Sequence, residues 1–301
     1  MTKKFRNKKE LKLFSWILAL TFSFFYLFDF SRNKSTFFMP KEYKEIKNLV
    51  NKLAAKNNLG DRKILFSINN ADYISWNMKD LELCKEKMCW YYKNLNPYKK
   101  YKDRNGINLN ELTNQAYLYG GIEAYAWNDI VWISKSTFRS IRENNGFLGC
   151  IIAHEISHIL FDDHIKDSLS LSSKLSDLGV LKNKKPNKKD LEDKEKKLLE
   201  MEISRYSEIQ ADISAAELLI NAGFPKDTCS KFLTYMTGFE KLEIDTDPNS
   251  SHPGYLERYS SLKKFISLYE IKSNLKVNKN NKWKWSFNRE LNVLTFIPKN
   301  K

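Results

Sequence analysis

The residues best suited to chemistry are two histidines and a glutamate in the segment His154-Glu155-Ile156-Ser157-His158. Residues four positions apart on an α-helix lie on the same face, so a helix here lets both imidazoles bind one metal ion. Glu155 lies beside them and can take a proton from a water on that metal without being a ligand itself. The spacing rarely arises by chance in a chain of 301 residues with four histidines. The pattern therefore predicts a catalytic zinc site.

The alternative is a helix whose two histidines are ordinary core or surface residues. Ile151, Ile152 and Ile159 flank the segment, which indicates that the histidines lie on or near a buried face. A buried imidazole without a partner is costly, and this cost favours the metal site.

Two residues are candidates for the third metal ligand. His164 has the spacing of the last histidine in HExxHxxGxxH, but Phe161 occupies the position of the glycine that lets the chain turn back. If the helix continues, His164 points about 120° away from His158. That direction suits a surface residue near the helix end, where its charge complements the helix dipole.

Glu208 is the better candidate. It shares one helical stripe with Asp212, Ala215 and Leu219, and the apolar members indicate that the stripe faces the core. Buried carboxylates need a cation or hydrogen-bond donors. A zinc ion for Glu208 and a histidine N–H for Asp212 would satisfy both, and the second contact would orient a ligating imidazole. The alternative is a solvated pair of carboxylates on an exposed helix.

An HExxH zinc site on a helix is typical of metallopeptidases. Hydrolysis of a peptide bond also requires a donor for the negative charge that develops on the substrate carbonyl. His252 and Arg258 are the candidates for this role. His252 can instead be a fourth metal ligand in a resting state, which would make it a gate, or an ordinary loop histidine.

Two short β-rich runs precede the motif, and Trp127-Asn128-Asp129 between them fits a hairpin connection. The second run is expected to be an exposed edge strand that binds an extended polypeptide by β-augmentation, through Ile130, Val131, Trp132 and Ile133. Such binding reads the backbone more than the side chains and predicts broad specificity. The same strand could equally be internal to a sheet.

The remaining pattern predicts an α+β fold, mostly helical and zincin-like, with a small β-sheet or hairpin beside the metal-binding helix. Helices are expected at 42–56, 137–143, 147–163, 189–222, 226–239 and 253–269, and strands at 64–68, 282–287 and 291–297. We assign one metallopeptidase domain to residues 46–270, with insertions at about 69–119 and 165–189, a linker over 31–45 and a β-like tail over 271–301.

The N-terminus carries an uncharged hydrophobic segment, Leu13–Phe28, after a lysine-rich start. The segment is long for the core of a signal peptide and slightly short for a full span. No small-x-small cleavage site follows it, which favours an anchor over residues 1–30 rather than a cleaved signal peptide. Lysines before the segment keep the N-terminus in the cytoplasm. We therefore expect a single-pass membrane protein with its catalytic domain on the far side, or a secreted protein if the segment is cleaved.

The formal net charge is +15, with basic clusters at 93–104 and 182–189. Solvated basic loops are the simpler interpretation, and no nucleic-acid partner is expected. Binding to an anionic surface through these clusters is the alternative.

The chain has four cysteines, none in a CxxC zinc spacing. Cys84 and Cys89 can close a small loop in an oxidising compartment. Cys150 lies in an apolar helical run and is expected to be a small core residue.

Together these segments resemble the HtpX and CAAX-prenyl-protease family of membrane-associated zinc peptidases. The matching segments lie within roughly half of the chain and include His154 to His158, Ser204-Arg205, Glu208 to Asp212, Ser251-His252-Pro253 and Glu257-Arg258. The resemblance implies a gluzincin site, HExxH…ExxAD, with His154, His158 and Glu208 as zinc ligands and Glu155 as the catalytic base.

We therefore expect a zinc endopeptidase with one Zn²⁺ per chain, acting on unfolded or membrane- or envelope-associated polypeptides. A role in protein quality control follows from the resemblance alone. The alternative is a catalytically idle zinc-binding module that holds misfolded chains, and the intact Glu155 argues against it.

Overall fold

The computed structural model describes residues 39–163 apart from 71, 81, 83, 105 and 143, and residues 189–238, 244–269 and 283–298. The hydrophobic segment Leu13–Phe28, His164 and nearly all of the second insertion lie outside these ranges. Among the helices that the ranges contain, none combines the length and the apolar character needed to cross a bilayer.

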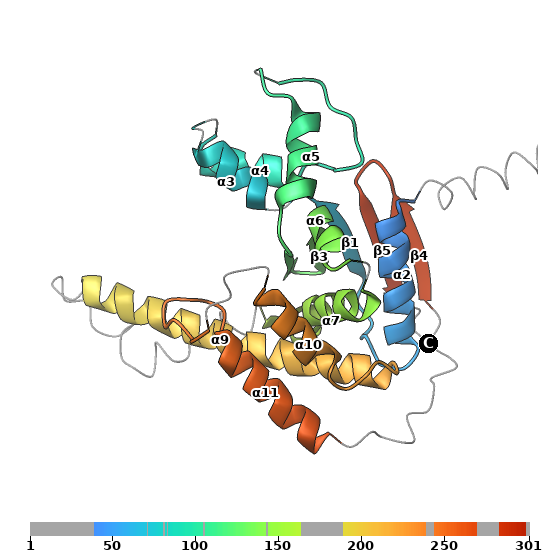
Figure 1. Cartoon of the computed structure of the whole chain (residues 1–301), viewed down its shortest axis with the longest axis vertical. Coiled ribbons are helices and arrows are strands. Elements are labelled where there is room, and N and C mark those ends of the chain that lie inside the picture. The colour runs from blue at the N-terminus through green and yellow to red at the C-terminus, as the bar shows by residue number, and fades with distance from the viewer. Residues whose placement is uncertain are drawn as a thin grey trace, which may run out of the picture.

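A five-stranded sheet forms the centre of the molecule, in the order β2-β3-β1-β5-β4 (Figure 1). β1 runs parallel to β3, and the other neighbours are antiparallel. The strands are Ile64–Asn69 (β1), Ala124–Trp127 (β2), Ile130–Ser134 (β3), Trp283–Asn288 (β4) and Val293–Pro298 (β5). The fold is mixed α+β with a small mixed sheet, as predicted, and of the two forms expected beside the metal-binding helix it has the sheet rather than a lone hairpin.

The C-terminal strands extend this sheet because they supply a neighbour for β1. β1 is buried along most of its length, and β5 pairs with it and contributes Leu294 and Phe296 to the core. Trp283 and Trp285 of β4 both donate their indole N–H groups to Asn51 Oδ1, at 2.6 and 2.8 Å. The segment predicted as a separate β-like tail thus shares a sheet and a core with the rest of the chain.

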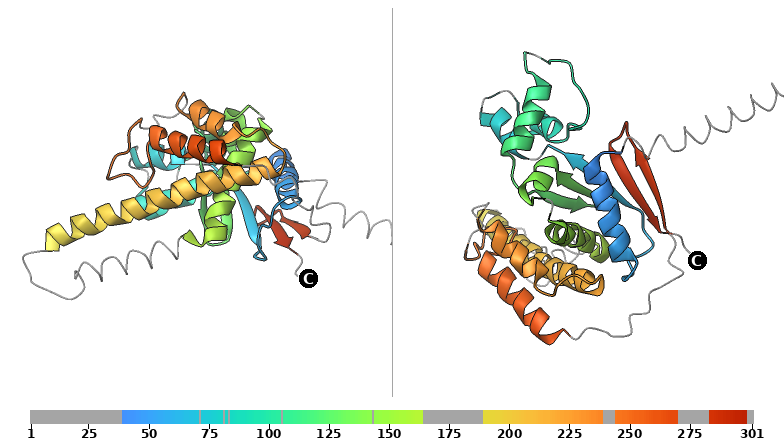
Figure 2. Two further views of the ribbon diagram at one scale, coloured as in Figure 1. Left: turned by 90° about the horizontal axis from the view of Figure 1, so that it is seen from below. Right: turned by 45° about the vertical axis from the view of Figure 1, so that its right-hand side comes forward.

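The first described helix, α2 (Lys41–Ala54), packs against the sheet (Figure 2). Its buried residues follow the helical period, with Tyr43, Ile46, Val50 and Leu53 on one face. The hydroxyl of Tyr43 accepts from the Ile68 amide at 3.0 Å and donates to the backbone carbonyl of residue 292 at 2.6 Å. Because α2 begins directly after Pro40, the last third of the predicted linker, residues 41–45, is helical.

The helix with the HExxH segment, α7 (Asn145–Phe161), lies between the sheet and the long helix α9 (Lys189–Asn221) (Figure 1). Asn144 caps α7 by accepting from the amides of Gly146 and Phe147, so the helix begins two residues before the predicted start at residue 147. A Cβ on Gly149 would meet the side chain of Leu219, which shows how closely α7 and α9 approach.

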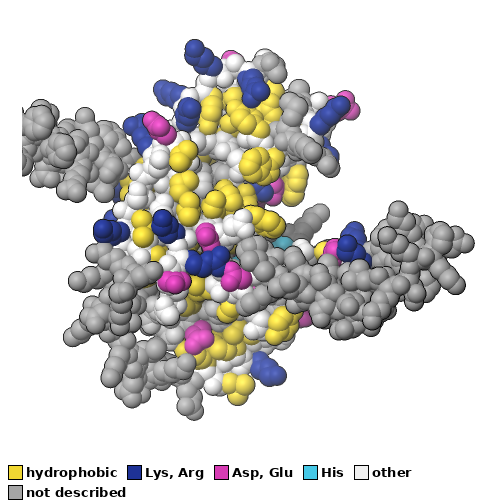
Figure 3. All heavy atoms as spheres, turned by 180° about the vertical axis from the view of Figure 1, so that it is seen from behind, with side chains coloured by type: hydrophobic (Ala, Val, Ile, Leu, Met, Phe, Trp, Pro, Cys, Tyr) yellow, Lys and Arg dark blue, Asp and Glu magenta, His cyan; other side chains and the backbone are white. Residues whose placement is uncertain are grey.

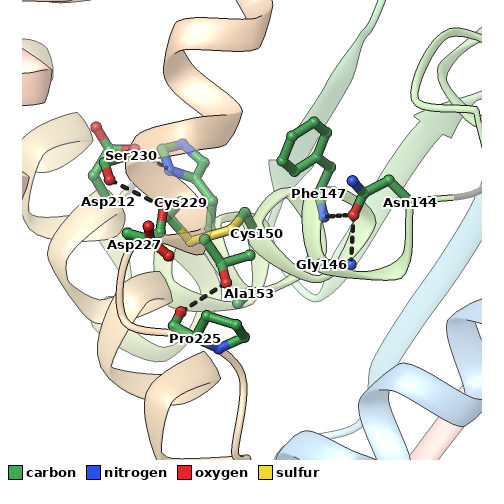
Figure 4. The surroundings of a disulfide bond; sticks show 12 residues. Asn144, Gly146, Phe147, Cys150, Ala153, Asp212, Pro225, Asp227, Cys229 and Ser230 are labelled. Atoms are coloured by element: carbon green, nitrogen blue, oxygen red, sulfur yellow. Dashed lines mark hydrogen bonds and ion pairs between the residues drawn. A yellow bond between two sulfur atoms is a disulfide. The ribbon is translucent and has the colours of Figure 1, made fainter.

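Two shorter helices, α10 (Thr228–Met236) and α11 (Tyr255–Leu268), pack against α9 and against each other. A disulfide between Cys150 and Cys229 joins α7 to α10 (Figure 4). Cys150 is buried in the core, as predicted, but the prediction gave it no disulfide partner. Its partner lies 79 residues away in the sequence, and only the packing of α10 on α7 brings the two sulfurs together.

The first insertion, between β1 and β2, forms a small unit with its own core. It contains α3 (Asp72–Asp80), α4 (Glu86–Lys93) and α5 (Leu109–Tyr119), and the Cys84–Cys89 disulfide closes the loop between α3 and α4. Its buried residues include Ile74, Met78, Tyr92, Leu95, Leu109 and Ala116. A last short helix, α6 (Lys135–Ser140), follows β3 and is capped by the Ser134 hydroxyl.

Candidate metal centre and cleft

Helices α7 and α9 bring three potential metal ligands together. His154 Nε2 and His158 Nε2 are 3.1 Å apart, and the two carboxylate oxygens of Glu208 lie 3.3 and 3.4 Å from them. Ligands about 2.0–2.1 Å from a tetrahedral zinc ion are about 3.3–3.4 Å from one another. The spacing of these three side chains therefore fits one zinc ion.

The outer nitrogens of both imidazoles face carboxylates. His154 Nδ1 lies 3.0 Å from Asp212 Oδ1, and His158 Nδ1 lies 2.8 Å from Asp163 Oδ2. When each Nδ1 carries the proton and donates it to these carboxylates, each Nε2 is unprotonated and its lone pair faces Glu208. Two lone pairs and a carboxylate that converge on one point need a cation between them, which is the chemistry of a divalent metal site.

The pKa values of the metal-free site also indicate that its centre favours a cation. Burial alone would lower the pKa of His154, but its hydrogen bonds with Asp212 and Glu208 outweigh burial and raise the pKa to about 9. Burial also opposes the charged form of His158, and the hydrogen bonds with Asp163 and Glu208 raise its pKa to about 10. Although burial opposes ionisation of Glu208, the histidines hold its pKa well below the usual range. The pocket thus stabilises positive charge at its centre.

Glu155 is buried and also lines the cleft beside the histidines. Burial raises the pKa of its carboxyl group above the usual range, against the attraction of the neighbouring histidines. A carboxylate whose pKa is raised towards neutrality is suited to accept and return a proton.

The family comparison agrees with this chemistry. The model of peptidase family M48 matches residues 105–266, which is more than half of the chain and includes all three convergent side chains. The chain belongs to peptidase family M48. No curated protein and no solved structure gives a significant match. As an M48 member the chain is a metalloprotease, and zinc is the typical metal of the family.

The M48 centre opens into a cleft of about 220 Å³. One wall is β2 and the first residue of the hairpin turn, and the other consists of α7 and α9. The wall on the β2 side contains Ala124, Tyr125, Ala126, Trp127 and Asn128. The turn forms because Asn128 adopts a left-handed backbone conformation, with φ of 53°.

The prediction of an exposed edge strand is wrong, and the alternative, a strand internal to the sheet, is confirmed. The segment predicted to bind substrate, Ile130, Val131, Trp132 and Ile133, forms β3, which lies between β2 and β1 and pairs with both. Its backbone is therefore engaged on both sides. The outer strand beside the cleft is β2, whose only neighbour in the described sheet is β3. The sequence shows a hairpin but not which arm pairs with β1.

Arg258 occupies a different place from the one predicted. Its Nε and Nη2 donate to the two oxygens of Asp212, at 2.7 and 2.6 Å, and it does not line the cleft. Although burial opposes ionisation of Asp212, Arg258 keeps its pKa below the usual range. The prediction of Arg258 as a transition-state donor is therefore replaced by a positioning role. It holds Asp212, which in turn holds His154.

His252 lies at the mouth of the cleft on the loop before α11. Its Nε2 is 3.5 Å from Glu208 Oε1, its Nδ1 is 2.9 Å from the Ser251 hydroxyl, and its side chain is 64% exposed. Both predicted roles, transition-state donor and resting ligand, need a histidine that can approach the metal from solvent. Neither is decided by this position, and both remain predictions.

Two residues of this region were not singled out in the sequence. Asp163 follows the end of α7 and contacts His158, and a carboxylate five residues after the second histidine is its only signal. Arg62 is the second. It donates to the carbonyl of Ile159 at 3.2 Å, pairs with Asp162, and reaches Asp129 in the hairpin turn at 2.8 Å. Arg62 thereby joins the end of α7 to the β2–β3 turn, and no local pattern predicts it.

Proposed function

We propose that this M48 member is a zinc-dependent endopeptidase that cleaves extended, unfolded polypeptides. The observation that carries the proposal is the convergence of His154, His158 and Glu208 beside Glu155, in a cleft whose opposite wall is an outer strand. A metal site with three protein ligands leaves one position open for chemistry.

In the proposed reaction, zinc would act as a Lewis acid on the scissile carbonyl and on the attacking water. Glu155 accepts the proton of that water and returns it to the leaving amine. Asp212 and Asp163 hold the two imidazoles in one tautomer and orientation. His252 donates a hydrogen bond to the oxyanion once substrate fills the cleft.

The substrate is proposed to bind as an added strand along the outer edge of β2. The backbone groups along the outer edge of a sheet can pair with any extended polypeptide, largely irrespective of its side chains. A folded protein offers few such segments, whereas an unfolded one offers many. This mode supports broad specificity for unfolded chains, and with it a role in protein quality control.

The proposed location is the far side of a membrane, with Leu13–Phe28 as the anchor and the N-terminus in the cytoplasm. Cleavage of this segment would give a secreted enzyme instead. In the described part of the chain all four cysteines are paired, and disulfides persist in oxidising compartments rather than in the cytosol. This pairing supports either extracytoplasmic location.

The test is cleavage of a reduced, unfolded protein by the full chain, next to Glu155→Gln. The wild type is expected to cleave, to stop when a chelator is added, and to recover with zinc. Glu155→Gln is expected to bind zinc and not cleave. Glu200→Gln is the matched control: it changes a partly exposed glutamate on α9 that pairs with Lys196, and it should keep full activity.

Equal cleavage by the wild type and Glu155→Gln would overturn the assignment of the base. Zinc-loaded wild type that cleaves no unfolded protein would favour the alternative function, an idle module that only holds misfolded chains.

A further inference from the structure

An exposed aromatic cluster lies on the first insertion, formed by Tyr73 and Trp76 of α3 and Tyr119 at the end of α5. The rings of Tyr73 and Tyr119 are 6.0 Å apart. Trp76 lies one helical turn after Tyr73, on the same side of α3. Trp76 and Tyr119 are each 66% exposed, although aromatic rings of this size usually bury much of their surface. Tyr73 is partly buried and packs against the core of the insertion, whereas Trp76 and Tyr119 present most of their surface to solvent.

The insertion is fastened directly to the start of β2. The backbone amide of Asp72, the first residue of α3, donates to the Glu123 carboxylate at 2.7 Å. At the end of α4, Lys93 pairs with the Asp72 carboxylate at 2.7 Å and lies over the Tyr125 ring, 4.5 Å from its centre. These contacts fix the aromatic cluster relative to the wall of the cleft.

The chain itself places the cluster at one end of the outer strand. Tyr119 precedes Ala124 by five residues, which span at most about 17 Å when extended. Tyr119 therefore lies within that distance of the start of β2, so a substrate strand that pairs with β2 and continues a few residues past Ala124 is long enough to reach it. Figure 3 shows hydrophobic side chains gathered over the upper part of the molecule, where α3, α4 and α5 lie, and reaching down towards a histidine.

We propose that Tyr73, Trp76 and Tyr119 form an extended subsite for apolar or aromatic side chains of the polypeptide substrate, several residues from the scissile bond. The proposal rests on the proposed endopeptidase function and adds to it a preference that backbone pairing cannot provide. Unfolded proteins expose the large apolar residues that folded proteins bury, so this subsite selects the same class of substrate as the strand edge.

The subsite acts on binding rather than on chemistry, because it lies away from Glu155 and the three metal ligands. Aromatic contacts distant from the reacting bond lower KM when the substrate reaches them and leave short substrates unaffected. Loss of two large aromatic contacts is expected to raise KM about tenfold for a reaching substrate.

The experiment compares two kinds of peptide with the zinc-loaded full chain. The short peptide covers only the strand that pairs with β2. Two long peptides share its sequence and carry two phenylalanines about five residues beyond it, one on the N-terminal and one on the C-terminal side. The doubly substituted Trp76→Ser, Tyr119→Ser variant is compared with Leu291→Ser, which removes a 71% exposed side chain from the β4–β5 turn at the other edge of the sheet.

For the wild type we expect a lower KM on one long peptide than on the short one. In the double variant the KM for that long peptide should rise about tenfold, while kcat and the kinetics on the short peptide stay unchanged. Leu291→Ser should behave like the wild type.

Cleavage of the short peptide by the wild type establishes the peptidase independently of the subsite. If both long peptides then give the same KM in the wild type and the double variant, the aromatic cluster is not a subsite. Equal losses on short and long peptides in a variant with an unchanged melting temperature would also overturn the proposal, because the effect would then not depend on whether the peptide reaches the cluster. Melting temperatures of both variants are therefore measured alongside the kinetics.

Discussion

Oδ2 of Asp163 lies 2.8 Å from Nδ1 of His158, so the residue just past the end of α7 orients an imidazole one turn back on the same helix. The loop holds this position because Asp162 adopts a left-handed conformation, with φ of 53°, and pairs with Arg62. His154 has the equivalent partner in Asp212, but from another helix. The two imidazoles are thus oriented by carboxylates from different segments of the chain.

We predict that Asp163→Asn weakens zinc binding by about 10–100-fold, because His158 loses the charged acceptor that fixes its tautomer. Competition with a coloured chelator measures the zinc dissociation constant without reference to activity. Asp80→Asn, at the exposed end of α3, is the control. An unchanged dissociation constant in Asp163→Asn would mean that the contact does not support the metal.

Arg258→Gln is predicted to destabilise the fold as well as the site. The change removes the bidentate partner of the buried Asp212, and a buried charge that loses its partner costs about 3–5 kcal/mol. Thermal unfolding should show a clear drop in melting temperature, together with weaker zinc binding through His154. Arg104→Gln, an exposed arginine in the first insertion, should leave both unchanged. A variant with normal stability and zinc affinity but a reduced kcat would restore Arg258 as a transition-state donor.

Metal binding is predicted to release protons at neutral pH. In the metal-free chain the pKa values of His154 and His158 are raised to about 9 and about 10, so both histidines are protonated at pH 7. Zinc needs their neutral forms, and its apparent affinity should therefore rise with pH and level off above the higher pKa. Calorimetric titration at pH 7 in two buffers of different ionisation enthalpy measures the release. Equal heats in both buffers would contradict the prediction.

The disulfide between Cys150 and Cys229 is predicted to stabilise the active-site helix. It closes a loop with a sequence separation of 79 residues, and such a crosslink contributes about 2–4 kcal/mol to the free energy of unfolding. Replacing both cysteines by alanine should lower the melting temperature and leave zinc affinity at low temperature intact. The same change at Cys84 and Cys89, with a separation of five residues, should have a smaller effect. Equal effects of the two pairs would show that loop length does not govern the stabilisation.

Several features of the protein follow from the sequence because they are local. The HExxH spacing places two imidazoles on one face of any helix, and the stripe with Glu208 and Asp212 does the same for two carboxylates. The helices and strands are found close to their expected positions because hydrophobic periodicity, Asn144 and the hairpin turn act over a few residues. The α+β class follows from the same patterns.

Only the tertiary structure decided which segments meet. The sequence shows a β2–β3 hairpin, but the parallel pairing of β3 with β1 makes β2 the outer strand. The cleft is therefore lined by Ala124–Trp127 rather than by the predicted segment Ile130–Ile133. Likewise Arg258 contacts Asp212 rather than the cleft, and Cys150 meets Cys229, because α10 and α11 pack on the helices of the site. Such pairings join residues tens of positions apart, so they depend on how whole elements bury their apolar faces and not on any local spacing.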